Sequence, residues 1–435
     1  MTETGAAWRC KVPIRKRIGA RQRCSVGKVL TSAMLVGAVP AMAQPRDVAG
    51  RSRDVQQPLS LYLPSAVASA PVSLRENDIR ITPALSVAYD DNIFRTIKGA
   101  SGREDELIVA PSVTAQVDRV LAGAQVTASA LYGYEVFTFH PDRSRPRIAL
   151  NARGTAGIAG TCSVTPYGEY RRERTDFGDL NAPLDNTIRT SRFGATATCQ
   201  RPAGLYPLLS AERYQSSNDG EFEYADQRTT SGVVGIGYRR PSLGQALAYY
   251  RRDDIVRPNQ VRGDSSVDRA GVAIDRAVSP LLTASVDLHW LSVRSQDPLI
   301  EDYGGLGWRA QIVSRALAPL KIEATAARSV VFDTLLTTAY AVQSSYSLVG
   351  QMQVNELTSA TLGFDYRTRD FRAPPNGVRG GLEKDQSPIF RAGLARQMTG
   401  RLFLRLDATH SRRKTEPSIG DFDATRVTAS AEMRF

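Results

Sequence analysis

The last nine residues, "VTASAEMRF", alternate between apolar and polar side chains with a period of two. Val427, Ala429, Ala431, Met433 and Phe435 are apolar, and the residues between them are polar. This is the pattern of a β-strand with one apolar and one wet face. An unpaired strand edge promotes aggregation in a soluble sheet, whereas a closed barrel in lipid has no free edge. The pattern therefore predicts that the terminal strand closes a barrel.

The same alternation recurs along the chain from Asp78 onward. It is clear in the segments 108–118, 361–367 and 401–408, where charged residues gather on the polar face. These segments exceed the five or six residues usual in soluble strands and approach the roughly 9 to 11 residues of tilted membrane strands. No long helical period appears, so the chain is predicted to be all-β.

Short turn signals separate pairs of strands at a spacing of roughly 40 residues, which fits two strands and one longer loop per unit. They are "RVLAG" (119–123), "CSVTP" (162–166), "CQRPAG" (199–204), "RRPSLG" (239–244), "AVSP" (277–280), "ALAP" (316–319), "VNELT" (354–358) and "RQMTG" (396–400). A propeller blade of similar length would hold four short strands. We therefore predict a transmembrane antiparallel up-and-down β-barrel of about 18 strands, with 16 as the alternative.

The region before Asp78 has a different composition. Residues 1–43 contain eight basic residues and one acid, so they hold about +7 of the net charge of +12. An apolar run (29–39) and the site Ala41-Met42-Ala43 follow, which is the three-part pattern of a secretory signal peptide. The run is shorter than the roughly 20 residues of a membrane-spanning helix. We predict cleavage between Ala43 and Gln44.

The remaining charge, about +5, is too small to indicate a nucleic-acid-binding protein. Residues 44–77 are polar and rich in proline and serine, without a sustained period, and are predicted to form a periplasmic linker. The predicted organisation is a signal peptide (1–43), a linker (44–77) and an outer-membrane β-barrel (78–435).

Two cysteines, Cys162 and Cys199, remain after removal of the leader. Export permits a disulfide between them. On the predicted strand map they lie two strands apart, with Cα atoms about 9 to 10 Å from each other, which is too far for a bridge in regular strands. A disulfide is therefore expected only if the strand ends bend together.

Charged side chains of mixed sign, with an excess of arginine, fall on the polar face of the predicted strands. Such a wall holds water and sets an electric field across a pore. The expected pore-lining residues are Arg153, Glu169, Arg171, Arg309, Lys321, Glu323, Arg367, Arg369, Arg391, Arg401, Arg405 and Asp407. They would mildly favour acidic sugars or other anions. Alternatively, the charges pair with each other across strands and leave permeation unaffected.

The first predicted strand reads "PALSVAYDDNIFR", Pro83 to Arg95. Asp90, Asp91 and Asn92 at its outer end bring together three oxygen-bearing side chains, which is a possible site for a divalent cation. We favour the simpler interpretation, a solvated strand end with local backbone hydrogen bonds.

The motif formed by Tyr89, Asp90, Asp91, Asn92, Phe94 and Arg95 resembles the first strand of the beta-barrel porin type 2 family. The resemblance implies a Gram-negative outer-membrane channel spanning roughly residues 78–435, and it assigns no catalytic residue. Because some members accompany capsule or exopolysaccharide export, it also implies periplasmic polysaccharide-export proteins as partners.

The terminal aromatic is similar to the signal read by the outer-membrane barrel assembly machinery. Phe435 is therefore the expected assembly signal, and this machinery and outer-membrane lipids are expected partners. Nucleic acid is not.

The three histidines, His140, His289 and His410, do not have metal-ligand spacing, and no metal or other cofactor is expected. His289 shares its predicted lumen face with Asp287, so an outer-membrane hydrolase is the least favoured alternative, since no nucleophile motif accompanies the pair.

The function predicted first is a conduit for export of capsular or exopolysaccharide across the outer membrane. One alternative is a passive diffusion porin for small solutes. Another is a structural or adhesive surface barrel, which would need long ordered outer loops.

Overall fold

The computed structural model describes residues 78–97, 101–121, 124–175, 186–242, 244–260, 263–298, 300–332, 340–372 and 383–435. The predicted signal peptide, its cleavage site between Ala43 and Gln44, and the predicted linker lie outside these ranges. Within them, no helix is long and apolar enough to cross a membrane.

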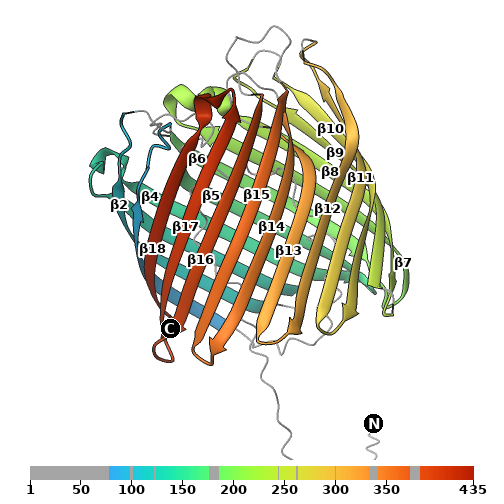
Figure 1. Ribbon diagram of the computed structural model, residues 1–435. Coiled ribbons are helices and arrows are strands. Elements are labelled where there is room, and N and C mark those ends of the chain that lie inside the picture. Colours follow the sequence, from blue (N-terminus) through green and yellow to red (C-terminus); the bar gives the residue numbers. More distant parts are fainter. Residues whose placement is uncertain are drawn as a thin grey trace, which may run out of the picture. The chain divides into compact units, whose positions relative to one another are not determined.

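The described residues form one antiparallel sheet of 18 strands, which closes into a barrel (Figure 1). Each strand pairs with the next along the chain, and β1 pairs with both β2 and β18. The strands are β1 (Asp78–Asp90), β2 (Glu106–Leu121), β3 (Ala124–Phe137), β4 (Arg145–Ala159), β5 (Cys162–Thr175), β6 (Asn186–Cys199), β7 (Gly204–Asn218), β8 (Gln227–Arg240), β9 (Gly244–Val256), β10 (Ser265–Ser279), β11 (Leu282–Ser295), β12 (Tyr303–Leu317), β13 (Leu320–Val331), β14 (Tyr340–Asn355), β15 (Thr358–Arg372), β16 (Lys384–Gln397), β17 (Leu402–Glu416) and β18 (Phe422–Met433). The predicted barrel is confirmed, and the alternative of 16 strands is wrong.

The two ends of the barrel differ in their connections. Short turns follow the even-numbered strands from β2 to β16 and define the turn end, where the C-terminus also lies (Figure 1). Longer connections define the loop end, and they include the 3-10 helices η2 (Pro141–Arg143), η3 (Gly220–Ala225) and η4 (Ser418–Gly420). Each predicted turn signal lies at or beside a short turn, although "CSVTP" begins β5 instead of forming the turn before it.

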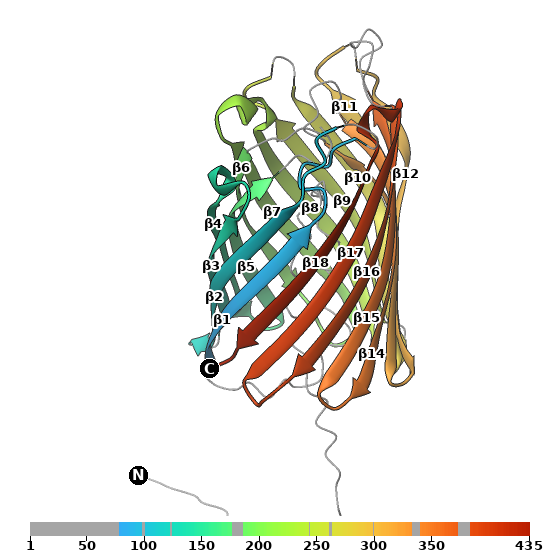
Figure 2. The same cartoon turned by 60° about the vertical axis from the view of Figure 1, so that its left-hand side comes forward.

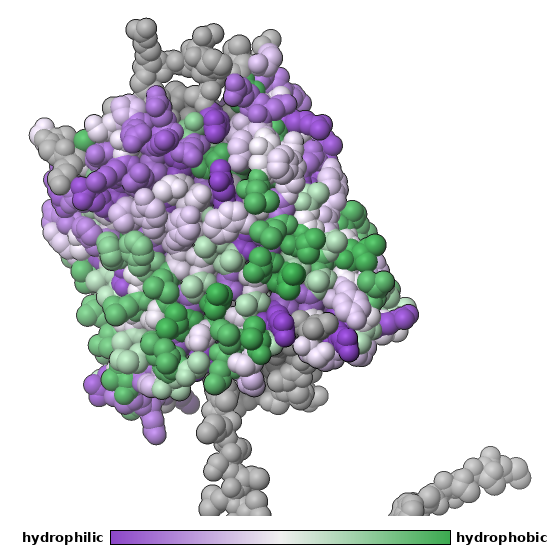
Figure 3. Space-filling view, turned by 45° about the vertical axis from the view of Figure 1, so that its right-hand side comes forward, coloured by the Kyte–Doolittle hydropathy of each residue, from purple (hydrophilic) through white to green (hydrophobic). Residues whose placement is uncertain are grey.

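The alternation of side chains places large apolar residues on the exterior, while the inner face carries charged and polar side chains together with buried apolar clusters, such as that of Leu208, Val233 and Leu247. Large apolar side chains with substantial exposure point outward, among them Tyr132 (61%), Leu209 (59%), Ile236 (63%), Trp290 (60%) and Leu362 (68%). On the face shown in Figure 3, hydrophobic residues gather toward the turn end and hydrophilic residues toward the loop end. In water each such side chain would forgo roughly 1.5–3 kcal/mol of burial. We call this surface the apolar band, and it is the surface that lipid covers in a membrane barrel.

The seam between β1 and β18 is closed by backbone pairing. The register runs from Ala84 opposite Glu432 to Asp90 opposite Arg426, and the two strands lie side by side in Figure 2. Phe435 extends this ladder at the turn end, because its N–H donates to the Ile81 carbonyl at 3.1 Å and its carbonyl accepts from the Ile81 N–H at 3.4 Å. The terminal residue therefore belongs to the closing pair.

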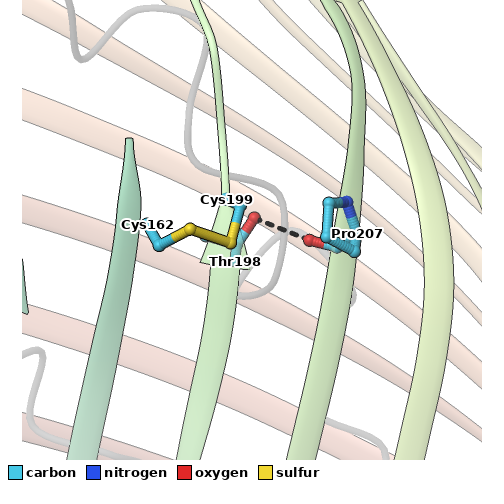
Figure 4. The surroundings of a disulfide bond; sticks show 4 residues. All are labelled: Cys162, Thr198, Cys199 and Pro207. Carbon is cyan, nitrogen blue, oxygen red and sulfur yellow. Dashed lines mark hydrogen bonds between the residues drawn. A yellow bond between two sulfur atoms is a disulfide. The ribbon is translucent and has the colours of Figure 1, made fainter. Parts of the chain in front are cut away.

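Cys162 and Cys199 form a disulfide (Figure 4). The expectation that they lie two strands apart is wrong. They are direct cross-strand partners on β5 and β6, with Cα atoms 3.7 Å apart. β5 and β6 are joined at the loop end, so the disulfide ties their opposite ends together at the turn end.

Removing Phe435 and removing only its ring should have different effects. Deletion of Phe435 eliminates both hydrogen bonds with Ile81, so we expect a lower yield of folded barrel after refolding into detergent micelles. Phe435→Ala keeps the backbone pair and should refold like the wild type. The folded fraction can be read from heat-modifiable migration on gels. Equal refolding of all three proteins would contradict a closing role for this residue.

Candidate channel lumen and loop-end rim

The interior wall carries nearly all the residues expected to line a pore. Arg153, Glu169, Arg171, Arg309, Lys321, Glu323, Arg367, Arg369, Arg391, Arg405 and Asp407 occupy strand positions that alternate with the outward apolar residues. Arg401 does not, because it lies in the turn before β17. It is exposed at the turn end of the barrel. The alternation therefore located the strand residues, and a turn residue was added to them in error.

Many of these charges form ion pairs, most of them along one strand. Arg405 contacts Asp407 at 2.6 Å, and Lys321 contacts Glu323 at 3.7 Å. Glu169 and Arg171 pair in the same way. Residues two apart on a strand share a face, so these pairs form without help from a neighbouring strand. Pairing across strands, the alternative considered from sequence, occurs between Asp365 and Arg391.

A buried cluster on β9 and β10 surrounds one carboxylate with two guanidinium groups. Asp253 accepts from Arg251 Nε at 2.8 Å and from Arg269 Nη1 at 2.6 Å. Arg251 and Arg269 are direct cross-strand partners, and all three side chains are almost completely buried. Two like charges side by side are stabilised here by the carboxylate between them. Two arginines therefore share this one buried carboxylate.

A second cluster of the same composition joins β15, β16 and β17. Asp385 accepts from Arg369 Nε at 3.0 Å and from Arg413 Nε at 3.0 Å. Sequence reasoning found Arg369 but missed both of its partners. It also missed the whole cluster on β9 and β10, although "RRDD" (251–254) places one arginine and one aspartate on each face of the strand.

The side-chain rings of Tyr206 and His289 lie flat against the inner wall and do not extend across the lumen. Tyr206 covers Gly237 on the neighbouring strand, where an added Cβ would come within 2.1 Å of the Tyr206 ring. His289 covers Gly307 in the same manner, with its Nε2 only 2.2 Å from an added Cβ. Glycine at these positions lets each ring lie close to the backbone of the sheet.

His289 and Asp287 meet on the inner face of β11, as predicted. Their Nδ1 and Oδ1 atoms are 3.1 Å apart, and the Tyr249 hydroxyl donates to the same carboxylate oxygen at 2.8 Å. The hydroxyl beside this pair thus belongs to a tyrosine, whereas a serine would be required for the hydrolase considered from sequence. The arrangement gives no support to that alternative.

The motif at the outer end of β1 folds differently from the expected strand end. β1 ends at Asp90, and residues 91–95 belong to the following loop. Asp90 is fully buried instead of solvated, and it forms a two-pronged ion pair with Arg95, with contacts of 2.7 and 3.0 Å. The expected local backbone bond is present, since the Asn92 N–H donates to Asp90 Oδ1 at 3.1 Å. Arg95 has a φ of 55°, so this ion pair stabilises a strained backbone.

The next two residues of the motif attach the loop to β18. Asp91 exchanges hydrogen bonds with Thr425, through its own N–H at 3.1 Å and through its carboxylate, which accepts from the Thr425 N–H at 2.7 Å. Asn92 Nδ2 donates to the Asp423 carbonyl at 2.9 Å. Arg103 bridges the carboxylates of Asp91 and Asp423 at 2.8 and 3.2 Å. The motif therefore secures the loop end of the seam that Phe435 closes at the turn end.

These contacts occupy the side-chain oxygens that a metal ion would need as ligands. The side-chain oxygens of Asp90, Asp91 and Asn92 already accept from N–H groups, including that of Thr96 at 2.8 Å to Asn92 Oδ1. Within the described ranges, no group of three histidine, cysteine or acidic side chains has the arrangement of a metal site. The geometry favours the interpretation in which these residues make hydrogen bonds.

The remaining motif residues face other neighbours. Tyr89 points outward and is 45% exposed. Phe94 packs edge-on against His140, with ring centroids 5.0 Å apart, and Arg143 lies over the Phe94 ring at 4.2 Å. His140 is held between Glu106 at 2.6 Å and Glu104 at 2.7 Å. The hydrogen bond with Glu106, aided by Glu104, raises the pKa of His140, because both carboxylates stabilise the protonated ring.

Comparison with known proteins adds only a weak structural likeness. No family model and no curated protein matches the sequence. The outer-membrane protein OpdK of Pseudomonas aeruginosa matches with 12% identity and a TM-score of 0.45, covering 82% of this chain and 99% of its own. OccK2 (OpdF) of the same organism matches with 10% identity and a TM-score of 0.47, with 83% and 99% covered. A BenF-like porin of Pseudomonas fluorescens Pf-5 has 11% identity and a TM-score of 0.47, with 83% and 100% covered.

The barrel expected from the resemblance to the beta-barrel porin type 2 family is present in the structure, as the sheet topology shows on its own.

Loss of the Asn92 side chain should weaken the seam. Asn92→Ala removes the bonds to Asp423 and Thr96, and we expect a loss of about 1–3 kcal/mol in unfolding free energy, because the carbonyl and N–H groups left behind are partly buried. Asn151→Ala is the matched control, since Asn151 is exposed and makes a single long bond of 3.4 Å to Ser129. Urea unfolding followed by tryptophan fluorescence measures both. Equal midpoints for the two variants would contradict the role of Asn92.

Proposed function

We propose that this chain is an outer-membrane channel for passive diffusion of small water-soluble solutes, with a mild preference for anions. The observation that carries the proposal is the closed barrel of 18 strands, with an apolar exterior and many charged side chains on its inner face beside the buried apolar clusters. Barrels of 16 to 18 strands are wide enough to enclose an aqueous passage. A lumen lined with paired and unpaired charges is one that water wets.

The preference for anions follows from the uneven pairing of the wall charges. In each of the two buried clusters, two arginines share one aspartate. Arg147 and Arg153 on β4 contribute a positive field to the lumen, since neither has a carboxylate within ion-pair distance among the described residues. The ion pairs along single strands contribute little net charge.

The outer-membrane location is supported by the apolar band and by strand lengths of 12 to 16 residues. A closed barrel satisfies its backbone hydrogen bonds within the sheet, which lipid requires. Lipids and the barrel assembly machinery are then the partners of the mature chain, the latter through β18 and the terminal Phe435.

Export of capsular or exopolysaccharide, the function placed first from the sequence, is motivated by the family resemblance, the barrel width and the arginine-rich lumen, and the last two suit a diffusion channel equally well. No described contact favours a polymer over a small solute. Binding of periplasmic polysaccharide-export proteins stays a prediction, and so does a structural or adhesive role at the cell surface. Passive diffusion of small solutes requires only the closed barrel and its charged inner wall.

The direct test is ion conductance of the purified, folded protein in planar phosphatidylcholine bilayers. We expect stepwise conductance increases as single barrels insert. A folded and inserted barrel without conductance would contradict the diffusion channel.

Reversing charge on the inner wall should change ion selectivity. Arg147→Glu combined with Arg153→Glu should shift the chloride-to-potassium permeability ratio several-fold toward potassium at about 0.1 M salt, where charges within roughly 10 Å act on the ion. Arg294→Glu combined with Arg328→Glu makes the same charge change on the outward face. Reversal potentials under a salt gradient measure both. An unchanged ratio in the first variant, or an equal shift in the second, would contradict the assignment of the lumen face.

A further inference from the structure

A row of arginines follows the edge of the apolar band on five consecutive strands, β5 to β9. On each strand an arginine lies two to six residues beyond an outward apolar side chain, toward the loop end. The pairs are Tyr170 and Arg172, Phe193 and Arg189, Leu209 and Arg213, Val234 and Arg228, and Tyr250 and Arg252. We call the five arginines the arginine belt.

The belt faces away from the lumen. Arg213 is the cross-strand partner of Phe193, which is 54% exposed, and Arg252 follows Tyr250, which is 44% exposed, by two residues on the same face. Residues that alternate with the inner wall cannot contact a solute inside the barrel. Any ligand of the belt therefore lies on the outside of the barrel.

Like charges within the belt lie side by side. Arg172 and Arg189 are direct cross-strand partners on β5 and β6. Adjacent like charges destabilise a sheet unless an anion lies between them. On the inner wall, Asp253 serves this purpose for Arg251 and Arg269. On the outside no carboxylate of the described residues contacts both Arg172 and Arg189, and Arg172 Nε is buried without a hydrogen-bond partner.

Acidic neighbours neutralise the belt only in part. Arg189 contacts Asp219 at 2.9 Å, and Arg252 contacts Asp254 at 3.0 Å and lies opposite Asp268. The side chains of the two contacts are 42–53% exposed, so these pairs are weak. Arg213 and Arg228 are exposed and have no ion-pair partner in the described ranges. The belt is therefore a positively charged strip next to an apolar surface.

We propose that the arginine belt binds phosphate groups of lipid headgroups in the outer leaflet. This inference rests on the proposed membrane location. A lipid whose acyl chains cover the apolar band places its headgroup just beyond the edge of that band, at the level of the belt. A guanidinium group offers two parallel N–H donors to phosphate, and two adjacent arginines can share one phosphate. The continuity of the charged strip with the apolar band distinguishes a lipid-borne phosphate from a soluble anion.

The test uses the purified, folded full-length barrel in a neutral detergent. Native mass spectrometry counts bound molecules of bis-phosphorylated lipid A, with the mono-phosphorylated form as a probe that has the same acyl chains but one phosphate fewer. The variant combines Arg172→Gln, Arg189→Gln, Arg213→Gln and Arg228→Gln. The control combines Arg294→Gln, Arg328→Gln, Arg412→Gln and Lys414→Gln, which removes four exposed outward charges from β11, β13 and β17.

We expect the variant to bind bis-phosphorylated lipid A at least tenfold more weakly than the wild type does. The affinity of the control for the same lipid should change by less than twofold. The wild type should bind the mono-phosphorylated form less well than the bis-phosphorylated form. Equal loss in variant and control, or no loss in either, would overturn the proposal. Full displacement of the lipid by millimolar inorganic phosphate would also overturn it, because the site would then recognise the free anion.

The channel proposal is tested separately by conductance in phosphatidylcholine bilayers, which lack these phosphorylated glycolipids. Weak lipid A binding with normal conductance would count against the belt alone. Absence of conductance with intact lipid A binding would count against the channel alone.

Discussion

Every backbone N–H and C=O group in a lipid-covered sheet must form its hydrogen bond within the sheet. In this barrel, the pairing of β1 with β18 meets that requirement for the first and last strands. Unlike the other neighbouring strands, these two are not consecutive in the chain. Their pairing is extended at both ends, by Phe435 with Ile81 at the turn end and by Asp91 with Thr425 at the loop end. If the seam opened, both strands would present unpaired edges to lipid.

Closure also fixes which residues face the lumen. Once β18 is in register with β1, every strand has one outward and one inward set of positions, and a shift of one residue would move Arg405 to the outside and Leu404 to the inside. The charged interior, the apolar band and the arginine belt all follow from that single register. The segment "RRDD" illustrates this, because Arg251 and Asp253 belong to a buried cluster while Arg252 and Asp254 form an exposed pair.

Most of the fold could be predicted from the period-two alternation, because this pattern depends only on which residues are apolar. It placed the start of β1 at Asp78 and the inward position of Arg391, and it indicated 18 strands. It could not show the clusters around Asp253 and Asp385, because those depend on how neighbouring strands are shifted along each other. The disulfide was missed because the count of strands between Cys162 and Cys199 was wrong. β5 and β6 form a hairpin whose open end brings both residues together.

Closure of the seam is tested most directly by a disulfide across it. Ala88 and Thr428 are cross-strand partners between the hydrogen-bonded pairs of the ladder, where Cα atoms of antiparallel strands are about 4.5 Å apart. In a Cys162→Ser, Cys199→Ser background, Ala88→Cys with Thr428→Cys should form a disulfide that joins the first and last strands and keeps the barrel from opening in hot detergent until a reductant is added. Ala88→Cys with Ala429→Cys places the two thiols on opposite faces and should not crosslink. No crosslink in the first protein, or equal crosslinking in both, would contradict a barrel closed in this register.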